Sequence, residues 1–225
     1  MSKEAKILIV IGAVVLIGGV LLAIFFNPQK SKPGKAVDTQ SLIRETSHMT
    51  KSASAKVNLV EFGDYQCPGC AAAHPRLKEL LNFYKDNNDV NFVFRNFPLS
   101  GHANAHIAAE AAEAAAKQGK FWEMHDMLYE KQEEWSTLPD PTEMFVSYAK
   151  SLGLNENDFR VALSQHLLSD VVDADYKDGQ AVEVGGTPTF FINGVKLESA
   201  NVPTVDELIA KIEEELKKYA YAEWI

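Results

Sequence analysis

Hydrophobic residues follow three different patterns along the chain, and the first is an unbroken run near its start. Ile7–Phe26 contains no charged or hydrogen-bonding side chain. At about 1.5 Å per residue, a helix of this length spans the hydrocarbon core of a bilayer. The run predicts a single-pass transmembrane anchor rather than a cleaved signal peptide, because Phe25-Phe26-Asn27-Pro28 is a poor cleavage site.

The segments on either side of this run are polar. Residues 1–6 are expected to be a cytoplasmic N-terminus, and residues 27–55, with their Pro, Gly, Ser and Lys, are expected to be a linker that tethers a domain. Lysines lie on both sides of the run, so the positive-inside rule does not decide its orientation.

The second pattern begins at residue 56, and residues 56–102 read as strand, helix and strand. Val57–Phe62 is a short apolar run typical of a buried strand, and Val90–Phe97 alternates like a second strand. Between them, apolar residues recur at helical spacing as far as Asp86. Two strands joined by a helix predict a right-handed crossover with a parallel pair.

The third pattern is helical and covers residues 103–184. This stretch is too long for a loop, and its start is rich in Ala and Glu. Gly119 is placed to end one of its helices. We therefore predict a helical insertion that packs over one side of the sheet.

Sheet character returns in residues 185–220, which complete the domain. Two apolar runs flank Asn193-Gly194, which is the strongest short signal for a β-hairpin. Thr204 and Glu207 have the spacing of a capping box at the start of a C-terminal helix, and residues 221–225 are left as a tail. The element order predicts an α/β fold in which a mixed sheet flanked by helices is interrupted by the insertion.

The charge of the chain excludes one class of binding partner. The net charge is −9, and the part before residue 36 is rich in Lys, so the domain that follows is more acidic still. An acidic domain without a basic stripe is a poor match for nucleic acid, and we exclude that class of partner.

The only two cysteines, Cys67 and Cys70, follow the first predicted strand. Pro68 suits the first position of a helix, so Cys67 should lie at a helix N-terminus, where backbone N–H groups and the helix dipole favour the thiolate. A stabilised thiolate attacks disulfides and also leaves readily. The pair is predicted to be redox-active, with Cys70 the more buried, resolving thiol; a structural disulfide closing so short a loop would add little stability.

Metal binding is another possible use of these cysteines. His74 lies four residues after Cys70 on roughly the same helix face, so Cys67, Cys70 and His74 could form a three-ligand copper or zinc site. Structural zinc usually has four ligands, and the chain has no second cysteine pair. The redox interpretation is favoured, and we expect no metal or other cofactor.

Three further positions are candidates for the same chemistry. Glu61 is on the strand face shared with Leu59 and could point inward. A buried carboxyl has a raised pKa and could exchange protons with the resolving thiol. An exposed or hydrogen-bonded carboxylate at the end of the strand is an equal alternative. Asp64 is nearer the sulfur but reads as a turn residue. Pro188 opens an apolar strand, and a cis bond there would present the backbone of Thr187 to an extended peptide.

Four segments together resemble the DsbA-like branch of the thioredoxin superfamily over roughly residues 55–220. They are, in order, DYQCPGC, FVFRNFPL, AAEAAAKQGKFWEMHDMLYE and GGTPTFFINGV. The resemblance implies a thioredoxin fold with an inserted helical domain and a redox-active pair in which Cys67 is the nucleophile. It also implies that Pro188 is cis and packs against the disulfide, and that Glu61 is the candidate for proton transfer.

The same resemblance implies a thiol:disulfide oxidoreductase that acts on cysteine pairs of exported proteins, with Thr187, Pro68 and Gly69 contacting the substrate. We expect it in the cell membrane with its catalytic domain on the extracytoplasmic side, where disulfides persist, and re-oxidised by a quinone-linked, DsbB-like or VKOR-like membrane partner.

Gly69 stands where the best-known oxidase of this group has histidine. Glycine supplies neither the positive charge nor the donor that a histidine would place near the thiolate, so we predict a less oxidising pair. A reductase or isomerase, a copper or zinc carrier, and a binding module that does not use its cysteines remain alternatives.

Overall fold

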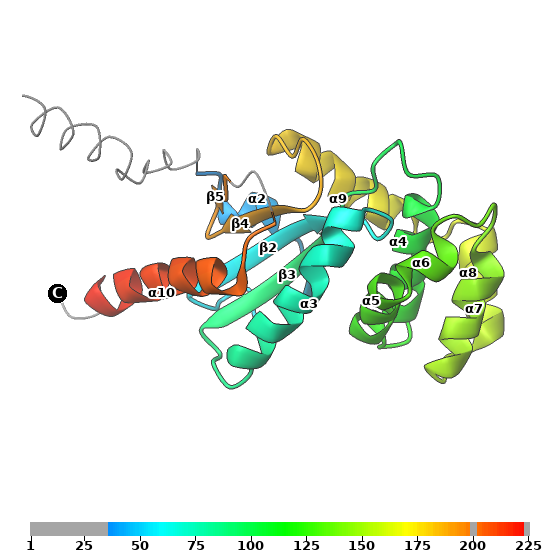
Figure 1. Cartoon of the computed structure of the whole chain (residues 1–225), viewed down its shortest axis with the longest axis horizontal. Coiled ribbons are helices and arrows are strands. Elements are labelled where there is room, and N and C mark those ends of the chain that lie inside the picture. The colour runs from blue at the N-terminus through cyan, green and yellow to red at the C-terminus, as the bar shows by residue number, and fades with distance from the viewer. Residues whose placement is uncertain (1–35, 199–201, 223–225) are drawn as a thin grey trace, which may run out of the picture. The chain divides into compact units, whose positions relative to one another are not determined.

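The computed structural model describes residues 36–198 and 202–222, which form a five-stranded sheet with helices on both faces (Figure 1). The strand order in the sheet is β1-β3-β2-β4-β5. The elements, in chain order, are α2 (Thr39–Leu42), β1 (His48–Met49), β2 (Val57–Gly63), α3 (Pro68–Phe83), β3 (Val90–Asn96), α4 (Ala105–Ala116), α5 (Phe121–Glu130), α6 (Gln132–Trp135), α7 (Thr142–Ser151), α8 (Glu156–Ser164), α9 (Ser169–Ala181), β4 (Thr189–Ile192), β5 (Val195–Lys196) and α10 (Val205–Ala222).

The sheet is mixed, as the sequence predicts. β2 is its central strand and is buried along its whole length. It pairs with β3 in parallel and with β4 antiparallel, which confirms the predicted parallel pair. β4 and β5 form the predicted hairpin, and both Asn193 and Gly194 between them have positive φ angles, of 46° and 82°. Such angles are the reason that Asn-Gly favours this turn.

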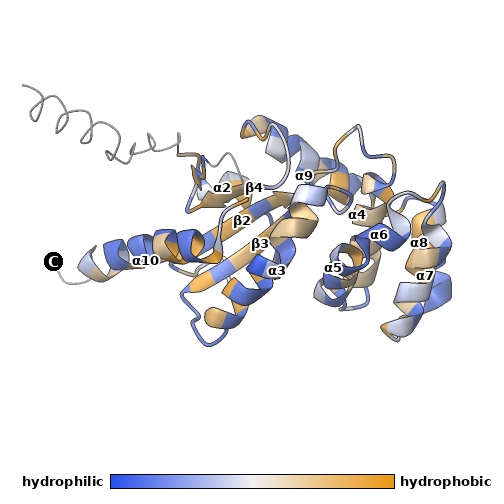
Figure 2. Cartoon of the chain, in the orientation of Figure 1, coloured by the Kyte–Doolittle hydropathy of each residue, from blue (hydrophilic) through white to orange (hydrophobic). Residues whose placement is uncertain are grey.

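Side chains that alternate along the strands separate two hydrophobic cores. Along β4, Phe190 and Ile192 belong to the larger core, whereas Phe191 belongs to the smaller one. The larger core includes Leu77 of α3, and the smaller one includes Leu42 of α2. Figure 2 shows hydrophobic and hydrophilic segments along β2 and β3, because these strands, although buried throughout, also carry polar residues such as Glu61 and Arg95. The sheet is therefore covered on both faces, which fixes the end of β2 from which the cysteine pair extends.

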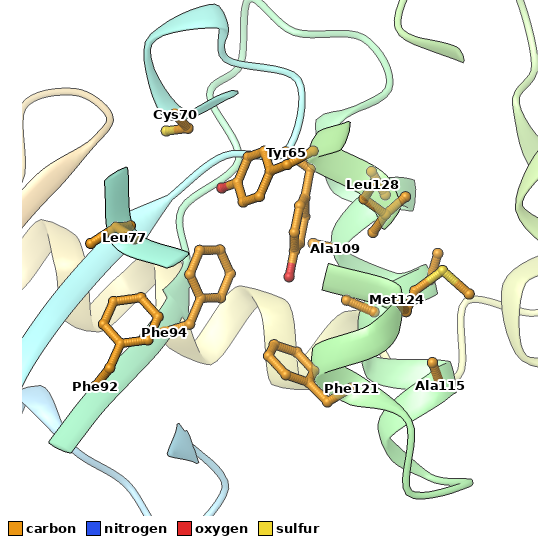
Figure 3. Close-up of a cluster of buried hydrophobic side chains, with 14 of the residues drawn as sticks. Tyr65, Cys70, Leu77, Phe92, Phe94, Ala109, Ala115, Phe121, Met124 and Leu128 are labelled. Carbon is orange, nitrogen blue, oxygen red and sulfur yellow. The ribbon is translucent and has the colours of Figure 1, made fainter. Parts of the chain in front are cut away.

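The predicted insertion is present as the helices α4 to α9, between β3 and β4. α4 contacts α5, α7, α8 and α9 and is the central helix of this group. Most of its side chains are alanines, and nearly all are buried, so neighbouring helices approach it closely. Figure 3 shows that the larger core continues from Leu77, Phe92 and Phe94 to Phe121 and Met124 of α5. The insertion is thus packed directly against the sheet domain.

The polar segment before β2 differs from the linker that we predicted over residues 27–55. Its described part forms α2 and β1, and β1 pairs antiparallel with β3. Leu42 is fully buried, and its carbonyl accepts a hydrogen bond from the Arg95 guanidinium. The prediction of a tether is wrong for this part, because one buried leucine and a two-residue strand carry too little periodicity to be recognised.

The predicted anchor, Ile7–Phe26, lies outside the described residues, as do residues 27–35. Among the helices of residues 36–198 and 202–222, none is both long enough and apolar enough to cross a membrane.

The C-terminal helix begins with the predicted capping box: the Thr204 N–H donates to the Glu207 carboxylate at 2.8 Å, and the Glu207 N–H donates to Thr204 Oγ1 at 3.3 Å.

Candidate active site

The cysteine pair lies at the start of α3, directly after the end of β2. Cys67 is the residue before the helix, with an extended backbone, and Pro68 occupies the first helical position, as predicted. The Cys67 N–H donates to the Asp64 carbonyl at 3.0 Å, which closes the turn between strand and helix. Cys67 is 8% exposed and Cys70 is 1% exposed, so only Cys67 has a face open to solvent.

The two thiols have opposite acidities. Hydrogen bonds from the Cys70 side chain, then from the Thr187 side chain and the backbone N–H groups of Cys70 and Gly69, outweigh burial and lower the pKa of Cys67 to about 5. Burial, above all, raises the pKa of Cys70 well above its ordinary value. At neutral pH the pair therefore holds a thiolate at Cys67 and a thiol at Cys70, which is the arrangement of a nucleophile and a resolving group.

The loop that opens β4 lies against this sulfur. The Thr187–Pro188 peptide bond is cis, as the resemblance implies. In its neutral form the Cys67 thiol donates to the Thr187 carbonyl, with 3.3 Å between Sγ and O. A Cβ atom at Gly69 would lie 3.3 Å from Cδ of Pro188 and 3.6 Å from Sγ of Cys67. Glycine at this position thus leaves the space between the sulfur and the proline open.

A groove of about 580 Å³ opens beside the cysteine pair. Its walls are formed by Gly69, residues 185–190, residues 196–198 and Val202-Pro203. The groove therefore places extended backbone, including that of Thr187, next to the end of α3 that carries Cys67. An extended peptide laid in this groove would pass the reactive sulfur.

Glu61 is buried in β2, so the inward alternative is confirmed. The side chain is 1% exposed, and neither carboxylate oxygen has a hydrogen-bond partner in the described part of the chain. Burial, with a smaller contribution from the Cys67 thiolate, raises the pKa of Glu61 to about 8. A carboxyl with this pKa both holds and releases a proton near neutral pH. Its role in proton transfer stays a prediction.

Asp64 is a turn residue, as expected, and its carboxylate also makes hydrogen bonds to neighbouring loop residues. Its carboxylate accepts hydrogen bonds from the N–H groups of Gln66 at 2.7 Å and Leu99 at 2.9 Å, and it lies 2.6 Å from Nδ1 of His102. The Asp64 N–H also points at Sγ of Cys70, 3.5 Å away. The residue thus fixes the loop in front of the cysteine pair.

The helical insertion holds the same loop through two glutamines that the sequence analysis missed. Gln132 Nε2 donates to the carbonyls of Tyr65 and Cys67, at 2.6 and 3.0 Å. Gln66 Oε1 accepts from the Asn104 N–H at 2.7 Å. The sequence pattern around these glutamines does not indicate their hydrogen-bond partners, because the contacts join positions far apart in the sequence.

His74 does not join the cysteines in a metal site. Among the described residues, Cys67, Cys70 and His74 do not form a group whose ligand atoms lie within 4.8 Å of one another. His74 is instead buried against the rings of His125 and Tyr129, with centroids 5.3 and 5.1 Å away. His74 lies in the interface between helices, so Cys67, Cys70 and His74 do not form the three-ligand site that the sequence suggested.

Known proteins share this fold. A family model described as thioredoxin matches residues 44–213. The chain is 26% identical to BdbD from Bacillus subtilis, over 82% of this chain and 97% of that one, with a TM-score of 0.70. It also matches alpha-DsbA1 from Wolbachia pipientis, at 18% identity over 80% of this chain and 96% of that one, with a TM-score of 0.70. The match to MdbA, a thiol-disulfide oxidoreductase from Corynebacterium diphtheriae, has 19% identity over 77% and 92% of the two chains and a TM-score of 0.59.

The curated relatives are much longer proteins. A Na(+)/H(+) antiporter NhaA 3 from Salinispora tropica is 40% identical over 151 residues, which are 67% of this chain and 22% of that protein. A Na(+)/H(+) antiporter NhaA 1 from Mycolicibacterium vanbaalenii is 37% identical over 159 residues, which are 68% of this chain and 24% of that protein. The chain spans about a quarter or less of the length of these relatives, so a similar segment occurs within a larger protein.

Proposed function

The chain belongs to the thioredoxin family, and from this premise we propose that it is a thiol:disulfide oxidoreductase of the DsbA type. Its reaction is the formation of disulfides in exported proteins through the pair Cys67 and Cys70. The observation that carries the proposal is the contrast between the two thiols, with the pKa of Cys67 lowered to about 5 and that of Cys70 raised by burial.

In the oxidised protein, a substrate thiolate attacks Sγ of Cys67. A substrate–Cys67 disulfide forms as the Cys67–Cys70 bond breaks, and Cys70 leaves with the electron pair. The buried Cys70 sulfur is a poor place for a charge, so it takes up a proton, and Glu61 is the donor that we propose.

A second substrate thiolate then attacks the substrate sulfur of the mixed disulfide. Cys67 leaves as a thiolate, which its low pKa favours. The substrate has lost two electrons and two protons and gained a disulfide. The cysteine pair has gained the two electrons and consists of a Cys67 thiolate and a Cys70 thiol until it is re-oxidised.

The groove beside Pro188 is the proposed place of the substrate chain. An extended segment there would meet the Thr187 backbone and Gly69, which both line the groove, and Pro68 is a further proposed contact. Because Gly69 leaves this space open, the groove admits cysteines with different flanking side chains. Main-chain contacts supply binding without a strict sequence requirement.

The proposed place of this reaction is the outer side of the cell membrane, with Ile7–Phe26 as the anchor. This proposal rests on the length of the apolar run and on the stability of disulfides outside the cytosol. A quinone-linked membrane protein of the DsbB-like or VKOR-like type is the proposed acceptor of the two electrons.

The test is the oxidation of a reduced, unfolded protein by stoichiometric amounts of the oxidised chain, followed by loss of free thiols. We expect wild type to transfer one disulfide per chain, and Cys67→Ser to transfer none. In a separate reaction, the reduced Cys70→Ser variant mixed with a substrate that carries a disulfide should accumulate a substrate–Cys67 mixed disulfide, because the resolving thiol is absent. Oxidation by Cys67→Ser at the wild-type rate would refute the proposal.

A reductase or isomerase is the second candidate, and Gly69 is the residue that favours it. Without a histidine beside the thiolate, the reduced form is less stabilised, and a weaker oxidant works more readily in the other direction. The redox state of the pair in cells separates the two: an oxidase is recovered mostly as a disulfide, and a reductase or isomerase mostly as a dithiol.

A further inference from the structure

Two histidines and an aspartate meet where the redox helix packs against the helical insertion. His74 lies on α3, and His125 and Asp126 lie on α5. One ligand atom from each of the three lies within 4.8 Å of the other two. Within the described residues they are the one group of three or more His, Cys, Asp and Glu side chains with this property.

One buried nitrogen of this cluster, Nε2 of His74, has no hydrogen bond. His74 is 4% exposed, and its enclosed Nε2 makes no hydrogen bond. Oδ1 of Asp126 lies 3.3 Å from this nitrogen, which is within ion-pair distance but is not aligned as a hydrogen bond. A buried ring nitrogen without a partner is costly. An ion held between the ring and the carboxylate would remove this cost.

His125 already has the second contact that a metal-binding histidine usually makes. Its Nδ1 lies 3.0 Å from the Tyr65 hydroxyl, and the side chain is 3% exposed. Such a contact fixes the ring and leaves Nε2 as the ligand atom. Tyr65 thus orients the ring of His125 in the way that an outer-shell residue orients a ligand.

Lys78 contacts only one of the two carboxylate oxygens of Asp126. Lys78 Nζ contacts Oδ2 of Asp126 at 3.0 Å and Glu130 at 2.6 Å, which leaves Oδ1 facing His74. Asp126 is 39% exposed, so the cluster has an opening to solvent. This opening provides both a path of entry and room for a water ligand.

We propose that His74, His125 and Asp126 bind a zinc ion, with a water molecule as the fourth ligand. Two imidazoles and one carboxylate form a ligand set that zinc accepts in tetrahedral geometry. Ligand atoms around tetrahedral zinc lie about 3.3 Å apart, so ligand atoms that now lie within 4.8 Å of one another must approach by up to ~1.5 Å. The exposed Asp126 side chain is the one with room to move.

A zinc ion here would join the redox helix to the insertion. His74 lies one helical turn beyond Cys70, and the other two ligands belong to α5. The ion would therefore stabilise the packing of these two helices without contacting either sulfur. Binding should be the same whether the cysteine pair is a disulfide or a dithiol.

The experiment is a zinc titration of the chelator-treated full chain in its oxidised state, followed by calorimetry. Oxidation removes both thiols as ligands, so any site that remains is independent of them. We expect one zinc per chain, and at least a tenfold loss of affinity in Asp126→Asn. Glu130→Gln is the matched control: it removes the other partner of Lys78 but no proposed ligand, and its affinity should equal that of wild type.

Cobalt is the second probe, because its visible absorption reports the geometry of its ligands. Tetrahedral cobalt bands in the oxidised wild type, absent in Asp126→Asn, would support the site. The proposal is overturned if the oxidised chain binds no zinc, if Asp126→Asn binds as tightly as wild type, or if Glu130→Gln loses as much affinity as Asp126→Asn. Since the site needs no thiol chemistry, loss of disulfide transfer in Cys67→Ser leaves this outcome unchanged.

Discussion

The Sγ atom of Cys67 lies 3.3 Å from the carbonyl oxygen of Thr187, a residue 120 positions later in the chain. The first comes from the start of α3 and the second from the loop that opens β4, on either side of the helical insertion. The surroundings of the reactive sulfur therefore come from both halves of an interrupted domain.

The acidity of Cys67 is the first prediction. Alkylation of the reduced protein by iodoacetamide should follow a titration with a midpoint near pH 5, because the thiolate is the reacting form. The rate should be constant above about pH 6 and fall below it. Trapping experiments over a series of pH values, with the labelled residue identified by mass spectrometry, give the midpoint.

Substitution of Cys70 tests the cause of this acidity. The Cys70 side chain is the largest contributor to the low pKa, so Cys70→Ala should raise the midpoint of Cys67 alkylation by about one unit or more. Cys70→Ser keeps a donor at the same position and should lie between the alanine variant and wild type. Equal midpoints in all three proteins would assign the low pKa to the backbone and Thr187 instead.

The pH dependence of stability is the second prediction, and it depends on Glu61. A carboxyl whose pKa rises from 4.5 to about 8 on folding binds its proton more tightly in the folded state. Its contribution is therefore complete below pH 4.5 and is lost as the pH rises through 8, a change of ~5 kcal/mol in the free energy of unfolding.

The oxidised protein isolates this effect, because its cysteines do not titrate. Denaturant unfolding of oxidised wild type should show stability falling between pH 4.5 and 8, and Glu61→Gln should flatten the slope. The slope of stability against pH is compared, and not the absolute stability of Glu61→Gln, because the buried amide of the variant also has no hydrogen-bond partner and lowers stability at every pH. An unchanged slope would mean that Glu61 is ionised in the folded protein.

The third prediction concerns the residue between Pro68 and Cys70. Gly69→His should raise the reduction potential of the pair, because an imidazole beside Cys67 donates to the thiolate and stabilises the reduced form. Each tenfold change in the equilibrium corresponds to about 30 mV. Equilibration with glutathione measures the potential. Gly69→Ala adds only a Cβ, 3.3 Å from Pro188, and should leave the potential near that of wild type.

The fourth prediction concerns Arg95, a fully buried arginine on β3. It pairs with Asp175 at 2.7 Å and with Asp178, and it donates to the Leu42 carbonyl. Arg95→Met should lower the free energy of unfolding by ~3–5 kcal/mol, because Asp175 would be left buried without its cation. Adding Asp175→Asn should recover part of this loss, as measured by urea unfolding; a neutral Arg95→Met would contradict the prediction.

The main elements of the fold could be predicted because their signals are local. The apolar runs of β2 and β4, the Asn193-Gly194 turn and the Thr204 capping box each lie within a few residues. The position of Pro68 gave the start of α3 in the same way. Such features depend on backbone preferences that a short window of sequence contains.

The parts that could not be predicted depend on partners far away in the chain. Arg95 reads as a polar residue in an alternating strand, and its burial follows from carboxylates about 80 positions later. The segment before β2 reads as a linker, because Leu42 is buried only once the sheet exists. His74 and His125 are ordinary helix residues until α3 and α5 pack together.

The separation of Cys67 from Thr187 also has a consequence for synthesis of the chain. A ribosome that adds ~5–20 residues per second needs about 6–24 s to make the 120 positions between them. Through this interval Cys67 has no Thr187 beside it and lacks one of the donors that lower its pKa. The nascent chain therefore carries a less acidic thiol, and its full reactivity develops only after β4 has been translated and has paired with β2.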